Sequence, residues 1–240
     1  DIRKISFFHI RSYIVDLMKN GMSAKSVNRK ISSLRSFYKY LIKKSIVDKN
    51  PMLKVISPKI PRRLPDYVSK TDIAILFDSI SLGNTYCEAR NYIIMLLLYN
   101  TGMRKSELIG LTDESVDYAQ KRIAVVGKGN KQRIIPVTND LLTKIRKYIQ
   151  IRNQSFECRE SFLLLTDKGK PMYPKLVYNV VNRVLVSMAT STKKSPHILR
   201  HTFATHMANN GAELNTIKEL LGHASLAATQ VYTHNSIEKL

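Results

Sequence analysis

The first fifty residues carry apolar side chains at the spacing of amphipathic helices, with polar residues between them. A first set recurs every three or four residues until Gly21 ends the pattern, and it consists of Phe7, Ile10, Ile14 and Leu17. Ser23 is a suitable N-cap for a second helix. We expect the buried side of that helix to hold Val27, Ile31, Leu34, Tyr38 and Leu41. Asn50 and Pro51 then break the helical pattern.

Beyond residue 66 the pattern becomes mixed. Ser69 is the first residue of a capping-box pattern, which predicts a short helix after it. An almost continuous apolar run predicts a buried helix over 89–101 that ends at Gly102. Two alternating runs, 122–126 and 132–137, predict strands, and the sequence GKGN between them predicts a hairpin turn.

The remaining residues are predicted to be helical. Helices are expected at about 139–152 and 174–188, and a further one begins at Ser195 and Pro196 and ends at Gly211. Two more N-caps are predicted, at Asn215 and Ser225, with Gly222 ending the helix that Asn215 begins. The chain is therefore expected to be mainly α-helical with one small β-sheet.

A proline-rich segment separates the two patterns. Pro58, Pro61 and Pro65 fall within eight residues, which favours an extended strap over a helix. We therefore predict an N-terminal helical domain over residues 1–57, a linker over 58–66 and a second domain over 67–240.

Net charge indicates more about the partner of this protein than overall composition does. The 240 residues include 39 Lys and Arg against 18 Asp and Glu, a formal net charge of +21. The first 66 residues hold +12 of that excess, and the other 174 hold +9. A basic excess of this size favours a polyanionic partner, above all nucleic acid.

Other classes of protein are disfavoured. The longest apolar run, 92–99, is far shorter than a membrane span, and the opening residues do not have the apolar h-region expected of a signal peptide. Cys87 and Cys158 are the only cysteines and form no CxxC pair, which fits a reducing cytoplasm. The chain begins at Asp1 without methionine, so we expect a fragment of a longer protein.

Several residues are uninformative when each is taken alone. Arg104 follows a helix stop, Lys128 lies at a hairpin tip, and either could be an ordinary surface charge. His197 and His201 are spaced to share a helix face and could hold a metal, but no HExxH glutamate or thiol accompanies them, so no zinc site is expected.

Together these residues resemble a known family, the tyrosine site-specific recombinases (phage integrases), and its Xer-like branch most of all. The resemblance rests on four motifs in a fixed order: TGMRKSEL at 101–108, HILRHTFATH at 197–206, LGH at 221–223 and TQVYTH at 229–234. It extends over about residues 25–234. It implies a SAM-like core DNA-binding domain, here partial, before a mixed α/β catalytic domain.

The resemblance also implies a role for each matched residue. Tyr232 matches the nucleophile, which forms a 3′-phosphotyrosyl link to DNA and frees a 5′-hydroxyl. Arg104, Arg200 and His223 match donors to the phosphate, Lys128 the general acid, and His197 the general base. Glu107 matches the acidic residue that braces this cluster. No cofactor, metal or ATP is expected. His201, His206 and His234 are expected to pack or hydrogen-bond.

The expected partner is double-stranded DNA carrying a specific recombination site, bound by a tetramer of protomers on two sites. Four basic residues on the helix after Ser23 are expected to contact it: Lys25, Arg29, Arg35 and Lys39. The reaction would serve chromosome dimer resolution or the integration and excision of a mobile element. Two departures from the family pattern concern DNA encirclement and cyclic assembly: the N-terminal part has few helices, and the chain ends eight residues after Tyr232.

Three other functions are alternatives to this one. A type IB topoisomerase-like enzyme would share the chemistry but religate the same strand. An inactive architectural DNA-binding protein is disfavoured by the intact set of matched residues. A metal-dependent nuclease is disfavoured because the sequence lacks clustered carboxylates.

Overall fold

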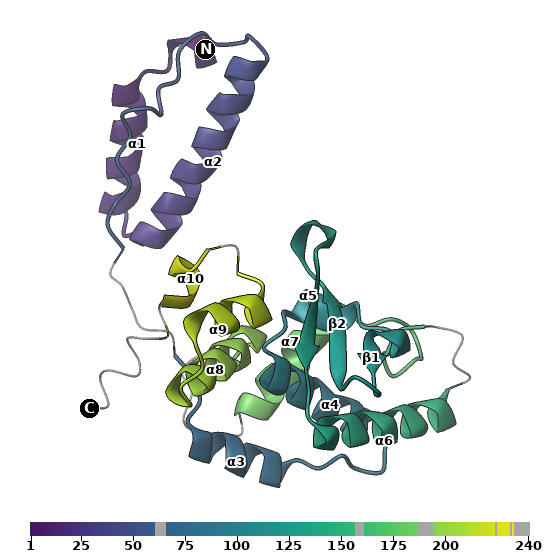
Figure 1. Ribbon diagram of the computed structural model, residues 1–240. Helices are drawn as coiled ribbons and strands as arrows, with labels where there is room; N and C mark the ends of the chain where they lie inside the picture. Colours follow the sequence, from purple (N-terminus) through teal and green to yellow (C-terminus); the bar gives the residue numbers. More distant parts are fainter. Residues whose placement is uncertain (61–65, 157–160, 187–193, 224, 231, 233–240) are drawn as a thin grey trace. The chain divides into compact units, whose positions relative to one another are not determined.

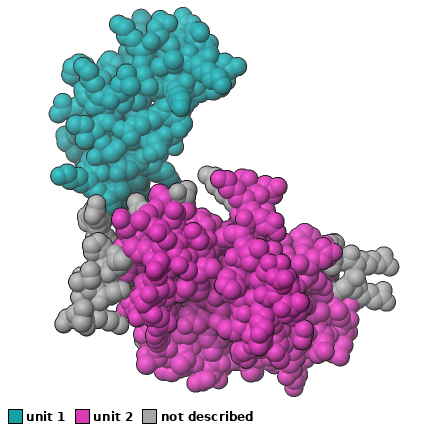
Figure 2. All heavy atoms as spheres, viewed as in Figure 1, with its two compact units in different colours: residues 1–63 teal, residues 64–240 magenta. Residues whose placement is uncertain are grey.

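The computed structural model describes residues 1–60, 66–156, 161–186, 194–223, 225–230 and 232. The chain divides into two compact units, residues 1–63 and residues 64–240 (Figure 2). The division falls inside the linker predicted at 58–66. The prediction of a mainly helical fold with a small sheet is confirmed. Among the described residues, no helix is both long enough and apolar enough to cross a membrane.

Unit 1 is built from two helices. A short 3₁₀ turn, η1 (Ile2–Lys4), precedes α1 (Phe7–Lys19) and α2 (Ala24–Lys43) (Figure 1). Ser23 caps α2 as predicted, because its hydroxyl accepts a hydrogen bond from the backbone N–H of Ser26 at 3.3 Å. The segment after α2 is held to that helix by the Asn28 side chain, which donates to the carbonyl of Pro58 at 2.9 Å.

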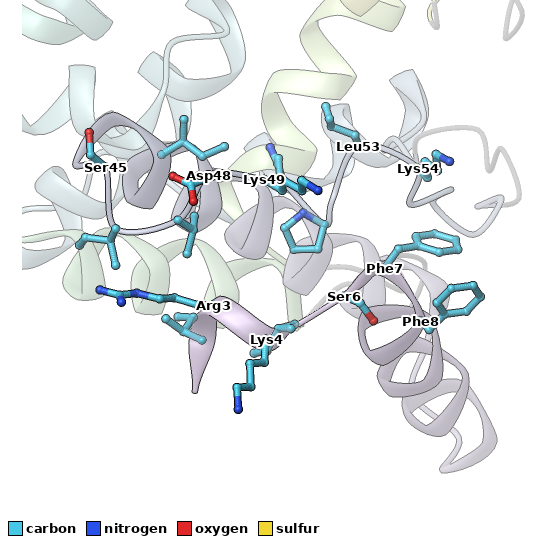
Figure 3. A pocket seen from close by; sticks show the side chains of 17 residues that line it. Arg3, Lys4, Ser6, Phe7, Phe8, Ser45, Asp48, Lys49, Leu53 and Lys54 are labelled. Atoms are coloured by element: carbon cyan, nitrogen blue, oxygen red, sulfur yellow. The ribbon is translucent and has the colours of Figure 1, made fainter.

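Unit 1 buries only part of its apolar surface. Its core consists of Ile10, Ile14, Val27, Ile31, Tyr38, Leu41, Val47, Met52 and Val55. Figure 3 shows a hollow between the start of α1 and the segment after α2. Phe8 and Leu53 line this hollow, and their exposed fractions are 74% and 81%.

Unit 2 surrounds the buried helix α4 (Tyr86–Thr101), which packs against α6 (Asn139–Ser155), α7 (Pro174–Val186) and α8 (Pro196–Asn209). Apolar side chains cover α4 on nearly every side, as expected for a central helix. The short helices α3 (Lys70–Ser79) and α5 (Lys105–Ile109) flank it in sequence, followed by the 3₁₀ turn η2 (Asp113–Ser115). The predicted end of α4 is confirmed, because Gly102 adopts a left-handed conformation there.

The sheet of unit 2 has three antiparallel strands in the order β1 (Val116–Asp117), β2 (Arg122–Val126) and β3 (Gln132–Pro136). Strands β2 and β3 pair from Arg122 opposite Pro136 to Val126 opposite Gln132. The 3₁₀ turn η3 (Lys128–Asn130) joins them, which confirms the predicted hairpin.

The last helices in the described part of the chain are α9 (Leu214–Leu221) and α10 (Ala227–Gln230). Two predicted caps were wrong. Glu213, not Asn215, caps α9, because the Ile217 N–H already donates to the Glu213 carbonyl at 3.1 Å. Asn215 is therefore the second residue of α9, inside the first turn, and does not precede the helix.

The second wrong cap is at the start of α10. The Gln230 N–H donates to the carbonyl of Leu226 at 3.0 Å, so the helix begins one residue after the position that Ser225 would cap.

Candidate active site

The turn after α4 holds one guanidinium in place. Gly102 has φ 59°, and a Cβ added there would lie 2.4 Å from the Phe203 ring, so α8 approaches this turn closely. Arg200, on α8, is 5% exposed and donates to the carbonyls of Gly102 and Leu221, both at 2.6 Å. Burial and the nearby charge of Arg104 lower the pKa of Arg200 to about 10, which leaves it charged at neutral pH.

A second guanidinium begins α5. The Arg104 side chain donates to Glu107 Oε1 at 2.8 Å and to the Gly222 carbonyl at 3.2 Å. Its backbone N–H donates to Glu107 Oε2 at 2.7 Å, so Glu107 also caps the helix. Arg104 and Arg200 thus bind the successive carbonyls of residues 222 and 221, which brings the two guanidiniums together. The Arg104 side chain is 34% exposed.

Glu107 is buried and also binds Arg133, a residue that the sequence analysis missed. Arg133 Nη1 and Nη2 donate to the two carboxylate oxygens, each at 2.8 Å. Burial alone raises the pKa of the Glu107 carboxyl, but the hydrogen bonds from Arg133 and Arg104 outweigh it and lower the pKa to about 2. One signal could have found Arg133: it lies two residues before buried Ile135, on the same face of β3.

His223 follows the end of α9. Its Nδ1 lies 3.0 Å from the hydroxyl of Thr229, which is fully buried on α10. Burial and the charges of Arg200 and Arg104 lower the pKa of His223 to about 4, so the imidazole is neutral at pH 7.

Tyr232 belongs to a small apolar cluster with Ala204, Ile217 and Leu221. It is 2% exposed, and its hydroxyl lies 2.8 Å from Nδ1 of His201. Burial raises the pKa of the phenol, and the charge of Arg200 opposes that effect. In this arrangement the hydroxyl contacts His201 rather than solvent.

The other predicted residues are placed less completely. His197 lies at the exposed start of α8, where partial burial of its ring and the charge of Arg200 lower the pKa. The backbone of Lys128 lies in η3, but its side chain is outside the described part of the chain. His206 Nδ1 lies 3.1 Å from the Tyr99 hydroxyl. His234 is outside the described residues.

The four basic residues predicted to contact DNA lie on α2. Lys25, Arg29 and Lys39 are exposed, and at about 100° per residue all four span an arc of about 120°. That arc faces away from buried Val27. The Arg35 guanidinium donates to the Val55 carbonyl at 2.7 Å, so part of it is used within unit 1.

Two family comparisons match this chain. Residues 72–239 match the phage integrase family, and residues 1–45 match the phage integrase N-terminal SAM-like domain. The first match includes the unit 2 residues of the site from Arg104 to Tyr232, and the second includes the four basic residues of α2.

Curated relatives are named tyrosine recombinase XerC. The one from Chlorobaculum tepidum is 34% identical over 96% of this chain and 75% of its own length. The one from Anoxybacillus flavithermus is 37% identical over 97% of this chain and 79% of its own length.

Solved structures with the same architecture include the XerA recombinase, 26% identical with a TM-score of 0.64 over 99% of this chain and 82% of that one. The XerH recombinase bound to its palindromic difH substrate gives a TM-score of 0.83 at 21% identity, over 100% and 71% of the two chains. The XerH likeness concerns the fold alone.

Proposed function

This chain belongs to the phage integrase family, and from that premise we propose how its own residues carry out the reaction of that family. It is a tyrosine recombinase, an enzyme of site-specific DNA recombination that cleaves and rejoins strands through a tyrosine. The comparisons give no support to a type IB topoisomerase or to an inactive DNA-binding protein.

The observation that carries the proposed roles is the pairing of two guanidiniums at one turn. Arg200 and Arg104 are anchored through the carbonyls of residues 221 and 222, immediately before His223. A phosphodiester under attack gathers negative charge on its non-bridging oxygens, and preorganised donors stabilise that charge. We assign this role to Arg104 and Arg200, with His223 as a third donor.

We assign the nucleophile to Tyr232. Attack of its hydroxyl oxygen on phosphorus forms the 3′-phosphotyrosyl bond and breaks the bond to the 5′-oxygen of the next nucleotide. The phenol loses its proton to His197, and Lys128 gives a proton to the leaving oxygen. Because Tyr232 is 2% exposed, the hydroxyl leaves His201 before a DNA phosphate meets it.

Glu107 acts on the arginines and not on the DNA. Its buried carboxylate accepts from both Arg104 and Arg133 and stays ionised at neutral pH, which fits a bracing role. No proton transfer is assigned to it.

Further proposals concern how the protein assembles on DNA and where it acts. We propose that four protomers assemble on two recombination sites, and that Lys25, Arg29 and Lys39 contact phosphates of each site. The reaction takes place in the cytoplasm, where such DNA would be found. It serves either chromosome dimer resolution or the movement of a mobile element.

Tyr232→Phe tests the assignment of the nucleophile. The wild-type protein is incubated with a suicide substrate that loses its free 5′-hydroxyl strand after cleavage. A denaturant-resistant adduct through the 3′-phosphate is expected, with peptide mapping placing it at Tyr232. The Phe variant should form none while binding DNA as well as the wild type, because only one oxygen is lost.

Tyr173→Phe is the matched control, because Tyr173 is an exposed tyrosine of the same unit. It should form the adduct at the wild-type rate. An adduct with Tyr232→Phe, or one mapped to Tyr173, would overturn the assignment. A two-site substrate that yields Holliday junctions separates recombination from topoisomerase action.

A further inference from the structure

Arg133 uses all three nitrogens of its guanidinium to join separate parts of unit 2. Nη1 and Nη2 bind the two oxygens of Glu107 at 2.8 Å, in the planar paired geometry that only arginine provides. Nε donates to the Leu220 carbonyl at 2.7 Å. The side chain is 14% exposed, less than half of the 34% of Arg104. Each of its three nitrogens therefore already has a protein acceptor, so Arg133 is poorly placed to bind DNA itself.

The first contact fixes the carboxylate that aligns Arg104. Glu107 accepts four hydrogen bonds, two from Arg133 and two from Arg104. Since Arg133 holds both oxygens, it sets the plane of the carboxylate and leaves Arg104 one defined direction in which to donate. Two cations on one buried anion also leave the group with net positive charge, which suits a neighbouring phosphate.

The second contact fixes the end of α9, which leads into His223. A Cβ added to Gly222 would lie 3.3 Å from both Cδ and Nη1 of Arg133, so the glycine turn packs directly on this side chain. Gly222 has φ 63°, the left-handed region that glycine tolerates. The position of His223 relative to Arg104 therefore depends on Arg133.

The third connection is through the strand itself. Arg133 lies on β3, which pairs with β2 across the hairpin of η3, the turn that contains Lys128 (Figure 1). On the other arm of that hairpin, a Cβ added to Gly127 would lie 3.3 Å from Glu107 Oε1. The hairpin, α5 and the end of α9 thus meet at Glu107 and Arg133.

We propose that Arg133 is a positioning residue for DNA cleavage, because it holds Arg104, through Glu107, in register with the His223 turn and the β2–β3 hairpin. This inference rests on the proposed function. It adds a residue that acts through others and does not touch the DNA.

The test compares Arg133→Lys with Arg122→Lys in suicide-substrate cleavage at saturating DNA. Lysine keeps the charge but cannot bind both Glu107 oxygens and Leu220 at once. Arg122 is the matched control: it lies on the neighbouring strand and pairs with partly exposed Asp117. DNA affinity and melting temperature are measured alongside, and each rate is normalised to the folded fraction.

Arg133→Lys is expected to slow cleavage about 10- to 100-fold, as misplacement of reacting groups by about 1 Å does. DNA affinity should change less than about twofold, and Arg122→Lys should behave as the wild type. The double variant Arg133→Lys/Glu107→Gln should be no slower than the slower single variant, because both act through one carboxylate.

Three results would overturn the proposal: an unchanged normalised rate, a defect confined to DNA affinity, or multiplying effects in the double variant. A lower melting temperature with an unchanged normalised rate would indicate a purely structural role. Failure of the proposed function is separate, because the wild-type protein would then form no adduct.

Discussion

The two units of this protein use positive charge in different ways. In unit 1 the basic side chains of α2 are exposed around a core of nine side chains, and apolar Phe8 and Leu53 remain open to solvent. In unit 2 Arg200, Arg133 and Glu107 are buried or nearly so beside a far larger core. Exposed charge gives salt-dependent attraction, whereas charge held in a fixed geometry can stabilise a transition state.

This difference separates binding from chemistry along the chain. Changes in unit 1 should alter DNA affinity or local stability and leave the intrinsic cleavage rate alone. Changes near Glu107 should alter the rate at saturating DNA.

Lys128→Ala should have the largest effect. Loss of a general acid typically slows a reaction by about 10²- to 10⁴-fold, and DNA affinity should change little. The rate is measured with a suicide substrate, and then with a 5′-bridging phosphorothiolate whose leaving sulfur needs no proton. Lys131→Ala, an exposed lysine beside the same turn, is the control. If the thiolate substrate does not restore the rate of Lys128→Ala, the lysine is not the acid.

Ile31→Ala should break unit 1 without affecting the chemistry of unit 2. Ile31 is fully buried, and removing such a side chain costs about 2–5 kcal/mol, a large loss for a core of nine side chains. Thermal unfolding followed by amide exchange should show early opening of unit 1 and not of unit 2. Ile75→Ala, at a 60% exposed position on α3, should change stability by less than about 0.5 kcal/mol. Equal destabilisation of both units would show that they unfold together.

Acid should weaken unit 2 through His223. Its folded pKa of about 4 lies below the unfolded value of about 6.5, so unfolding takes up a proton at intermediate pH. Stability present above about pH 6.5 is therefore lost as the pH falls towards 4. Burial of the imidazole contributes most to the lowered pKa, and the charges of Arg200, Arg104, His201 and Arg133 add to it. Glu107, with a pKa of about 2, stays ionised over this range.

The measurement is the melting temperature of unit 2 at pH 7 and pH 5, for the wild type and His223→Gln. Glutamine cannot titrate but can still form a hydrogen bond with Thr229. The melting temperature of His223→Gln should therefore fall less than that of the wild type between pH 7 and pH 5. His197, whose pKa is also lowered, accounts for part of the remaining fall. An equal fall in melting temperature for both proteins would show that His223 does not cause the loss of stability in acid.

The sequence predicted the parts of the molecule that depend on local chemistry. The predicted helix end at Gly102, the predicted N-cap at Ser23 and the predicted β2–β3 hairpin were correct, because helix caps and turns are specified by a few neighbouring residues. The cap predicted at Asn215 was wrong because the backbone hydrogen bond from Ile217 to Glu213 already places Asn215 within the first turn of α9.

The contacts of Arg133 and Tyr232 could not be predicted in this way. Arg133 meets Glu107 26 residues away and Leu220 87 residues away, and Tyr232 meets His201 31 residues away. Such pairs depend on how α5, α8, α9 and β3 pack, and periodicity within one element does not specify it. The motif resemblance suggested which residues gather, but not which hydrogen bonds they make.

The smallest expected effects are those of single basic residues on α2, and they test the charge of unit 1 most directly. Each phosphate contact that is lost should reduce the slope of log affinity against log salt by about 0.9. Lys25→Ala and Arg29→Ala should each show this loss between about 50 and 200 mM salt, with cleavage at saturating DNA unchanged. Arg35→Ala should show a smaller loss of slope, because its guanidinium already binds the Val55 carbonyl.

Lys30→Ala is the control, since this exposed lysine lies on α2 outside the basic arc and should leave the slope unchanged. Equal losses for Lys30 and Lys25 would mean that the charge of unit 1 acts as a diffuse field and not through one face of α2.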